Sequence, residues 1–304
     1  MDRQNPVSAT RPNSPSAYAM LAAAALIYGG IFTVNKLAAA GGVPPLAYSF
    51  WQSFGAGVVL WLALTLHGER LGMTRQHLVG YIVIGVLVIG IPITLLTYIA
   101  PRLSAGVMTL VLALSPPFTF MLSVLGRLER FRVMGLLGLV CGFIGVAVVV
   151  LPGATLGSPG AWKWFLLALV APLLFASSNV AAAVLRPPAA SSAAMGAGVL
   201  FGSSFVLLPI MVIAGQWWFP WTFDDGTIAT LIAVAINAAF LVLFFEIIRR
   251  AGPTFFAQFN YLAVLAGVAW GGIVFGERLT LTFFLAMVLM FVGVFLSGYQ
   301  RQAA

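Results

Sequence analysis

The sequence predicts an all-α membrane protein of ten transmembrane helices, arranged as two inverted five-helix repeats around a central cavity. The first observation is composition: 62% of residues are hydrophobic and 7% are charged, whereas soluble proteins carry roughly 25% charged residues. This excludes a soluble enzyme, a disordered protein, a secreted disulfide scaffold and a nucleic-acid binder. The second observation is a series of long apolar runs with short connections, and the third is an internal repeat whose unit holds an odd number of such runs.

The apolar runs have the length of membrane spans, because a spanning helix needs about 20 mostly apolar residues. The first run, from Tyr18, follows a polar, proline-containing tail; we interpret it as a span and not a signal peptide, since many similar runs follow it. The ten predicted spans are 18–39, 44–66, 77–99, 104–125, 133–151, 161–184, 194–214, 227–248, 253–275 and 281–299. The predicted organisation is therefore a disordered tail (1–17), a first repeat (18–151), a linker (152–160) and a second repeat (161–299).

The distribution of Lys and Arg predicts the orientation, since these residues are enriched in cytoplasmic loops. With a cytoplasmic N-terminus, the outer side holds only Lys36, Arg102, Lys163 and Arg278, and the other eleven of the 15 basic residues lie inside. Ten spans return the C-terminus to the cytoplasm as well. We expect a multi-pass protein of a bacterial inner membrane with both termini cytoplasmic. The formal charge of +8 is scattered over the ends of the runs, so we expect no nucleic-acid partner.

The internal repeat emerges when the chain is shifted by 148 residues. Glu129-Arg130 then coincides with Glu277-Arg278, and Gly145-Val146 with Gly293-Val294. Five spans per unit place the second copy in the membrane with the opposite direction, so Glu129 is predicted to be cytoplasmic and Glu277 external. Inverted repeats are typical of secondary transporters, with a site near the midplane between the halves.

These features resemble the drug/metabolite transporter superfamily, in its ten-span branch of EamA-type transporters. The resemblance rests on Tyr28-Gly29-Gly30-Ile31-Phe32 in the first span, Ser115-Pro116-Pro117 in the fourth, and the turns at 126–130 and 276–279 that precede a closing Gly-Val span. It covers residues 18–299. It implies alternating-access movement of a small solute, often export of amino acids or other metabolites, through a cavity lined by spans one, three, four, six, eight and nine.

Polar residues inside the predicted spans are the candidates for substrate binding, since a buried polar group in hydrocarbon needs a partner or a ligand. For any single Asn or Gln the alternative is an interhelical hydrogen bond, worth about 0.6 kcal/mol on average. Clustering on corresponding spans favours a cavity with aromatic and uncharged polar walls. The predicted substrate-binding residues are Tyr28, Asn35, Gln52, Tyr81, Tyr98, Ser115, Ser178, Asn179, Asn237, Gln258, Tyr261 and Trp270.

Proline and glycine mark two further features. Pro116 and Pro117 interrupt the fourth span, and we interpret the pair as a hinge, with a fixed structural kink as the alternative. In the fifth span Gly135, Gly138, Gly142 and Gly145 share one face. Small residues allow close helix packing, so this face predicts a contact between the halves or between protomers.

The residues that several kinds of catalysis and cofactor binding require are missing from the sequence. The sequence has no phosphate-binding loop, no nucleophile–base pair within the spans and no metal-binding cluster, so we predict no enzyme, cofactor or metal. Glu246 lies beside Arg249 and Arg250 and is interpreted as a salt-bridged boundary residue, not a proton carrier. The leading hypothesis is a secondary transporter exporting small organic metabolites, most of all neutral or aromatic amino acids. The alternatives are a drug or quaternary-ammonium exporter and, in another class, a channel or membrane scaffold. The expected partners are a small-molecule substrate and the lipid bilayer, for a monomer or homodimer.

Overall fold

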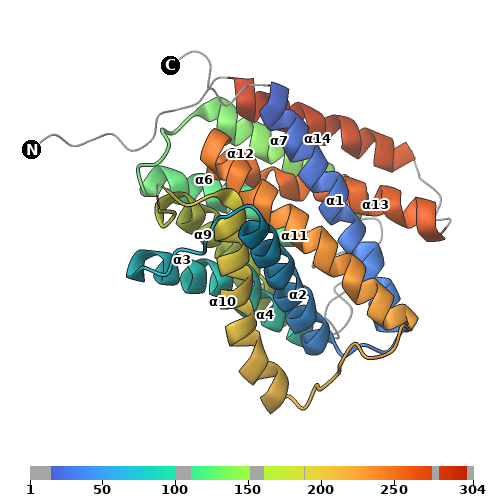
Figure 1. The fold of residues 1–304 in the computed structure, drawn as a ribbon. Helices are drawn as coiled ribbons and strands as arrows, with labels where there is room; N and C mark the ends of the chain where they lie inside the picture. Colours follow the sequence, from blue (N-terminus) through green and yellow to red (C-terminus); the bar gives the residue numbers. More distant parts are fainter. Residues whose placement is uncertain (1–14, 100–110, 151–160, 188, 276–280, 300–304) are drawn as a thin grey trace, which may run out of the picture.

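The computed structural model of the chain describes residues 15–99, 111–150, 161–187, 189–275 and 281–299. Within these ranges the chain is helical with short connecting turns and contains no strand (Figure 1). The all-α class expected from composition is therefore confirmed for the described part of the chain. Residues 1–14 of the predicted tail (1–17) lie outside the described part. The last three residues of that tail already belong to α1, which begins at Pro15.

The first half contributes helices over each predicted span of the first repeat. Two of these segments are irregular. A π-helical turn, Val86–Gly90, joins α3 to α4, and in the fourth span a turn at 113–114 precedes α6. The helices are α1 Pro15–Ala40, α2 Pro45–Leu66, α3 Arg75–Gly85, α4 Ile91–Ile99, α6 Ser115–Leu125 and α7 Val133–Val150.

The second half has the same kind of organisation, again with interrupted segments. Leu169 separates α8 from α9, and Gln258 separates α12 from α13. The helices are α8 Ala161–Ala168, α9 Val170–Val184, α10 Ser192–Ile213, α11 Asp225–Ala251, α12 Pro253–Ala257, α13 Phe259–Phe275 and α14 Leu281–Tyr299.

Seven helical segments of the described chain are long and apolar enough to cross a membrane. They cover α1, α2, α3 with the following π turn and the start of α4, α8 with α9, α10, α11, and α12 with α13. Two shorter apolar helices, Ser115–Leu125 and Val133–Val148, lie within further predicted spans. Ten spans and their inverted arrangement stay predictions.

The packing pairs helices of one half with helices of the other, and it does so in equivalent ways. α1 packs against α11 and α13, and its counterpart in the second half, α9, packs against α3 and α6. Likewise α2 contacts α10 and α11, and α10 contacts α3. α7 lies along α14 in Figure 1 and in the contacts. A shift by one repeat therefore maps the contacts of α1 onto those of α9 and α2–α11 onto α10–α3, while α2–α10 and α7–α14 map onto themselves, as expected for two related five-helix units.

The glycine face of α7 is used within the chain. A Cβ placed on Gly293 of α14 would lie 2.6 Å from the carbonyl oxygen of Gly138, and one on Gly142 would lie 2.2 Å from the ring of Tyr261. Only hydrogen atoms fit at these distances, so the glycines permit the close approach. The glycine face of α7 is expected from the sequence to contact either the other half of the chain or another protomer, and in the structure it contacts the other half.

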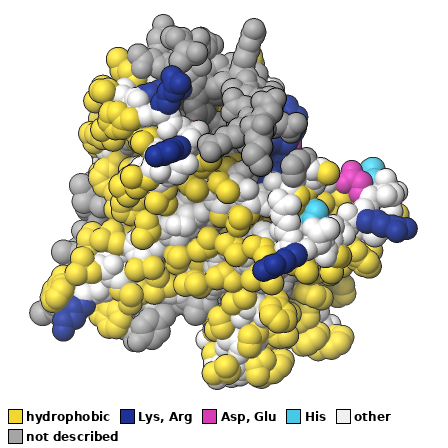
Figure 2. All heavy atoms as spheres, turned by 90° about the vertical axis from the view of Figure 1, so that its left-hand side faces the viewer, with side chains coloured by type: hydrophobic (Ala, Val, Ile, Leu, Met, Phe, Trp, Pro, Cys, Tyr) yellow, Lys and Arg dark blue, Asp and Glu magenta, His cyan; other side chains and the backbone are white. Residues whose placement is uncertain are grey.

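The surface is that of a protein surrounded by hydrocarbon. Figure 2 shows one face on which hydrophobic side chains predominate, with a few scattered Lys and Arg side chains. Large apolar side chains such as Phe205, Ile213 and Ile273 are at least 74% exposed. Such extensive apolar exposure is unfavourable in water and is expected in a bilayer.

Candidate functional site

One set of predicted site residues meets where α1, α2 and α11 run together. The Tyr48 hydroxyl on α2 donates a hydrogen bond of 2.7 Å to Asn35 Oδ1 on α1. Asn237 Nδ2 on α11 donates to Gln52 Oε1 on α2 at 2.9 Å and to the Ala233 carbonyl at 2.9 Å. The structure thus brings Gln52 and Asn237 together although they are 185 residues apart in sequence.

A second set lies at the junction of α6, α9 and α12. Asn179 Nδ2 donates to Thr119 Oγ1 at 3.1 Å, and Thr119 Oγ1 donates to the Ser115 carbonyl at 2.8 Å. Ser178 is buried beside Asn179 but bonds within its own helix, to the Phe175 carbonyl. These contacts join a helix of the first half to a helix of the second.

Two buried side-chain oxygen atoms, on Ser115 at the start of α6 and on Gln258 at the end of α12, are without partners among the described residues. Ser115 is fully buried and Gln258 is 2% exposed, and neither Ser115 Oγ nor Gln258 Oε1 has a hydrogen-bond partner there. Leaving a buried polar atom unpaired costs about 1–3 kcal/mol. Such atoms suit a position at which a polar solute completes the hydrogen bonds.

Both unpartnered residues stand at interruptions of their helices. Ser115 begins α6, and Gln258 separates α12 from α13. α12 itself begins at Pro253 after Gly252, whose φ of 83° is readily adopted by glycine and reverses the chain after α11. Discontinuous helices in corresponding segments of two repeats are typical of transporter binding sites, because the interruption leaves backbone groups free for a ligand.

The predicted hinge prolines occupy the first turn of α6. Pro116 and Pro117 directly follow Ser115, at positions whose N–H groups have no partner in an α-helix. Proline is tolerated there without loss of a backbone hydrogen bond. The pair thus marks the start of a helix, and the hinge stays a prediction.

An aromatic cluster lies between α1, α11 and the α12–α13 interruption. The ring of Tyr28 on α1 is 4.2 Å from that of Phe240 on α11 and 5.6 Å from that of Phe259 on α13. The Phe240 ring is also 6.1 Å from that of Phe256 and 4.9 Å from that of Phe259. It therefore packs against aromatic residues on both sides of the Gln258 interruption. Because Phe240 lies one helical turn after Asn237, the cluster extends from the first polar set to the Gln258 interruption.

Other predicted site residues have contacts that join helices. The Tyr261 hydroxyl, fully buried, donates to the Leu139 carbonyl of α7 at 2.9 Å. Trp270 Nε1 donates to the Leu26 carbonyl of α1 at 2.9 Å. Tyr81 is buried against Gly198 of α10, and its hydroxyl lies near the backbone of Gly72 in the α2–α3 connection. The side chain of Tyr98 lies outside the described residues.

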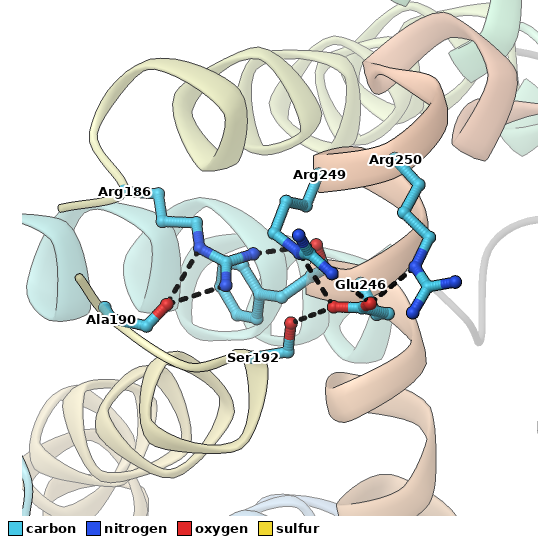
Figure 3. Close-up of polar contacts among 7 residues, drawn as sticks. Arg186, Ala190, Ser192, Glu246, Arg249 and Arg250 are labelled. Carbon is cyan, nitrogen blue, oxygen red and sulfur yellow. Dashed lines mark hydrogen bonds and ion pairs between the residues drawn. The ribbon is translucent and has the colours of Figure 1, made fainter. Parts of the chain in front are cut away.

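A charged cavity of about 560 Å³ lies at another place, where the α2–α3 and α9–α10 connections meet the end of α11. Its charged and imidazole side chains are Glu69, Arg70, His77, Arg186, Glu246 and Arg249. Glu246 pairs with Arg249 and Arg250 and accepts a bond of 2.7 Å from Ser192 Oγ (Figure 3). The salt-bridged interpretation of Glu246 is therefore confirmed.

Arg186 is held differently from the other cations of this cavity. It donates to the Ala190 carbonyl, at 2.7 and 3.2 Å, and to the Phe245 carbonyl at 3.1 Å (Figure 3). Burial lowers the pKa of the Arg186 guanidinium, as does the nearby charge of Arg249, while Glu246 acts in the opposite direction. From the sequence, Arg186 is expected only to orient the chain, as one of the inner basic residues, whereas Arg249 is also expected beside Glu246.

Comparison with known proteins agrees with this arrangement. The model of the EamA-like transporter family matches residues 15–151 and again residues 162–299. The chain belongs to the EamA-like transporter family. The resemblance noted in the sequence is thus confirmed, and the chain is a multi-pass member of a family of membrane transporters.

Two individual proteins are similar to this family member. An uncharacterized transporter of Bacillus subtilis (strain 168), YoaV, is 28% identical over 107 residues, which is 35% of this chain and 37% of that protein. The match thus spans little more than a third of the relative. A crystal structure with 16% identity superposes over 93% of this chain and 98% of its own, with a TM-score of 0.79; at this identity it shows the fold alone.

Proposed function

We propose that this EamA-like transporter is a secondary transporter that exports small organic metabolites, with neutral or aromatic amino acids as the best-fitting class. The observation that carries the proposal is the pair of unpartnered buried atoms at helix interruptions: Ser115 Oγ at the start of α6, and Gln258 Oε1 between Phe256 and Phe259 of the aromatic cluster. The proposed site comprises this pair with Tyr28, Asn179 and Asn237.

The chemistry of these residues suits a solute that is polar at one end and apolar at the other. Hydroxyl and amide groups replace water around a polar head group, and aromatic faces accept an apolar side chain. An aromatic face also attracts an ammonium group, worth about 0.5–2 kcal/mol. None of these five side chains carries a formal charge, so binding is weak and release is fast.

The proposed mechanism is alternating access. The equivalent packing of the two halves, α1 on α11 and α13 against α9 on α3 and α6, supports it. Two inverted units that exchange conformations give inward- and outward-open states of similar energy. In this proposal the protein resides in a bacterial inner membrane with both termini cytoplasmic.

Counterflow in proteoliposomes tests the proposal. Vesicles loaded with unlabelled phenylalanine are expected to accumulate labelled phenylalanine transiently, and Ser115→Ala and Gln258→Met should reduce this uptake. Tyr261→Phe, which removes a hydroxyl outside the proposed site, is the matched control. Flux without counterflow or saturation would identify a channel and contradict the proposal.

Export of drugs or quaternary ammonium compounds is the second candidate, and the aromatic cluster favours it. Rings of Tyr28, Phe240, Phe256 and Phe259 offer the faces on which a quaternary ammonium group binds. In the same vesicles, counterflow of a cationic dye without counterflow of phenylalanine or threonine would assign the site to this class.

A further inference from the structure

The charged cavity at the ends of α2, α9 and α11 is lined by charged side chains that form no ion pair with a described residue, as well as by the ion pairs of Glu246. Of its carboxylates, Glu246 is neutralised by Arg249 and Arg250. Glu69 accepts one hydrogen bond of 2.7 Å, from Ser191 Oγ, and forms no ion pair with a described residue. One carboxylate lining the cavity therefore has a neutral partner only.

The cation Arg186, on the same cavity, likewise has only neutral hydrogen-bond partners among the described residues. Its guanidinium donates hydrogen bonds to the carbonyl oxygens of Ala190 and Phe245, and it too forms no ion pair within the described part of the chain. The side chain is half-buried. Withdrawing a charge from water without a counter-ion is costly, so an anion entering the cavity gains a favourable interaction.

Both charged groups are held in place by the fold. The carbonyl groups of Ala190 and Phe245 fix the Arg186 guanidinium between the α9–α10 connection and α11 (Figure 3). Ser191, which caps α10 by accepting a bond from the Ala194 amide, also donates to Glu69. Groups fixed before a ligand arrives lose little entropy when it binds.

We propose that this cavity is a binding site for a small zwitterion, whose anionic group contacts Arg186 and whose ammonium group contacts Glu69. Its volume of about 560 Å³ is typical of small-molecule sites, which span about 300–1,000 Å³. Glu69 and Arg70 are both exposed and lie on the solvent side of the cavity; of the two, Glu69 is the one held by a hydrogen bond from Ser191. The site is separate from the uncharged residues at the helix interruptions and rests on the proposed function only where the zwitterion is taken to be the exported amino acid.

Two sources supply this chemistry: a free amino acid and the ethanolamine phosphate head group of a lipid. Both carry an ammonium group a few bonds from an anion. Equilibrium binding to the full chain, purified in detergent without lipid, distinguishes them when phenylalanine and phosphoethanolamine are the probes. Because phenylalanine is also expected at the uncharged site, saturable binding supports this cavity when Glu69→Gln weakens it, and the zwitterion that binds more tightly identifies the source.

Charge selectivity is the decisive measurement. Phenylpropionate keeps only the anion of phenylalanine and phenethylamine only the cation, so each should bind roughly tenfold or more weakly, the scale of one charge-assisted contact. Glu69→Gln should weaken phenylalanine binding by a similar factor, because the amide oxygen still accepts from Ser191 but no charge remains. Asp225→Asn, which removes a carboxylate from the smaller cavity of Asp225 and Leu37, is the matched control.

Three results would overturn the proposal: no binding of either zwitterion, equal affinity for phenylalanine and phenylpropionate, or unchanged affinity in Glu69→Gln. Arg186→Lys, which keeps the positive charge, is a second variant in case thermal melting shows that Glu69→Gln is unfolded; it should retain more affinity than Arg186→Gln. Counterflow by the unmodified protein reports separately on the transport proposal. Active counterflow with unchanged binding in Glu69→Gln would reject this cavity alone.

Discussion

Asn237 of α11 and Gln52 of α2 form a hydrogen bond of 2.9 Å that joins the two halves of the protein. The same Asn237 Nδ2 group also donates to the Ala233 carbonyl one turn earlier in α11. Asn237 is buried and Gln52 is half-buried. The contact thus stabilises the association of the halves within an apolar environment, and it occupies groups that also line the proposed site.

We expect this pair to be energetically coupled. Removing either amide alone, as in Gln52→Leu or Asn237→Leu, leaves the other without its partner and lowers stability, whereas the double variant loses less than the sum. Hydrogen bonds between helices in membranes are worth about 0.6 kcal/mol on average and up to about 1.7 kcal/mol, so the coupling should fall in this range. Thermal melting of the four proteins in detergent measures it. Strictly additive effects would show that the bond contributes nothing.

Adjacent glycines of α1 provide a second test, directed at the packing of α1 on α13. A Cβ on Gly29 would lie 2.4 Å from the Cβ of Ala266, whereas one on Gly30 would have its nearest contact at 3.6 Å, to Trp270 Nε1. Gly29→Ala should therefore force the helices apart and cost about 1–3 kcal/mol. Gly30→Ala is the control and should be nearly neutral. Equal melting temperatures for the two variants would contradict the packing of α1 described here.

Glu246 is expected to take no part in coupling to protons. Two arginines and Ser192 surround its carboxylate, so the group stays ionised and serves to hold α11 to α10. An imposed pH gradient should leave phenylalanine accumulation unchanged in proteoliposomes, and Glu246→Gln should lower the melting temperature. Ser192→Ala is the milder companion variant. Uphill accumulation driven by the pH gradient and abolished in Glu246→Gln would require proton coupling through this residue.

The helices could be predicted from the sequence because the apolar runs have the length that a bilayer demands. The helix interruption before α6 was signalled by Pro116 and Pro117, which cannot continue a regular helix. The interruption at Gln258 has no such local signal beyond Gly252-Pro253 several residues earlier. Phe256 and Phe259, on either side of the interruption, pack against Phe240 of α11, and sequence periodicity does not report such a contact.

The candidate site was harder to predict than the fold, since a helix that is apolar all around gives no indication of which side a polar residue faces. Tyr261 and Trp270 were expected at a binding site, yet both donate to backbone carbonyls of neighbouring helices. Conversely, Glu69 and Arg186 lie in connections far apart in sequence, where charges are ordinarily explained by orientation. Only the three-dimensional arrangement brings them to one cavity.

The inverted arrangement makes the most consequential prediction: Glu129, after α6, faces the cytoplasm, whereas Glu277, which lies outside the described residues, faces the opposite side. An odd number of spans in each repeat requires this, and alternating access depends on it. In a Cys141→Ser background, single cysteines at positions 129 and 277 should react with a membrane-impermeant maleimide from opposite sides of the membrane. Cysteines at positions 69 and 224 extend the measurement, since we expect the first inside and the second outside. Labelling of positions 129 and 277 from the same side would exclude inverted repeats and, with them, the symmetric exchange of conformations on which the transport mechanism rests.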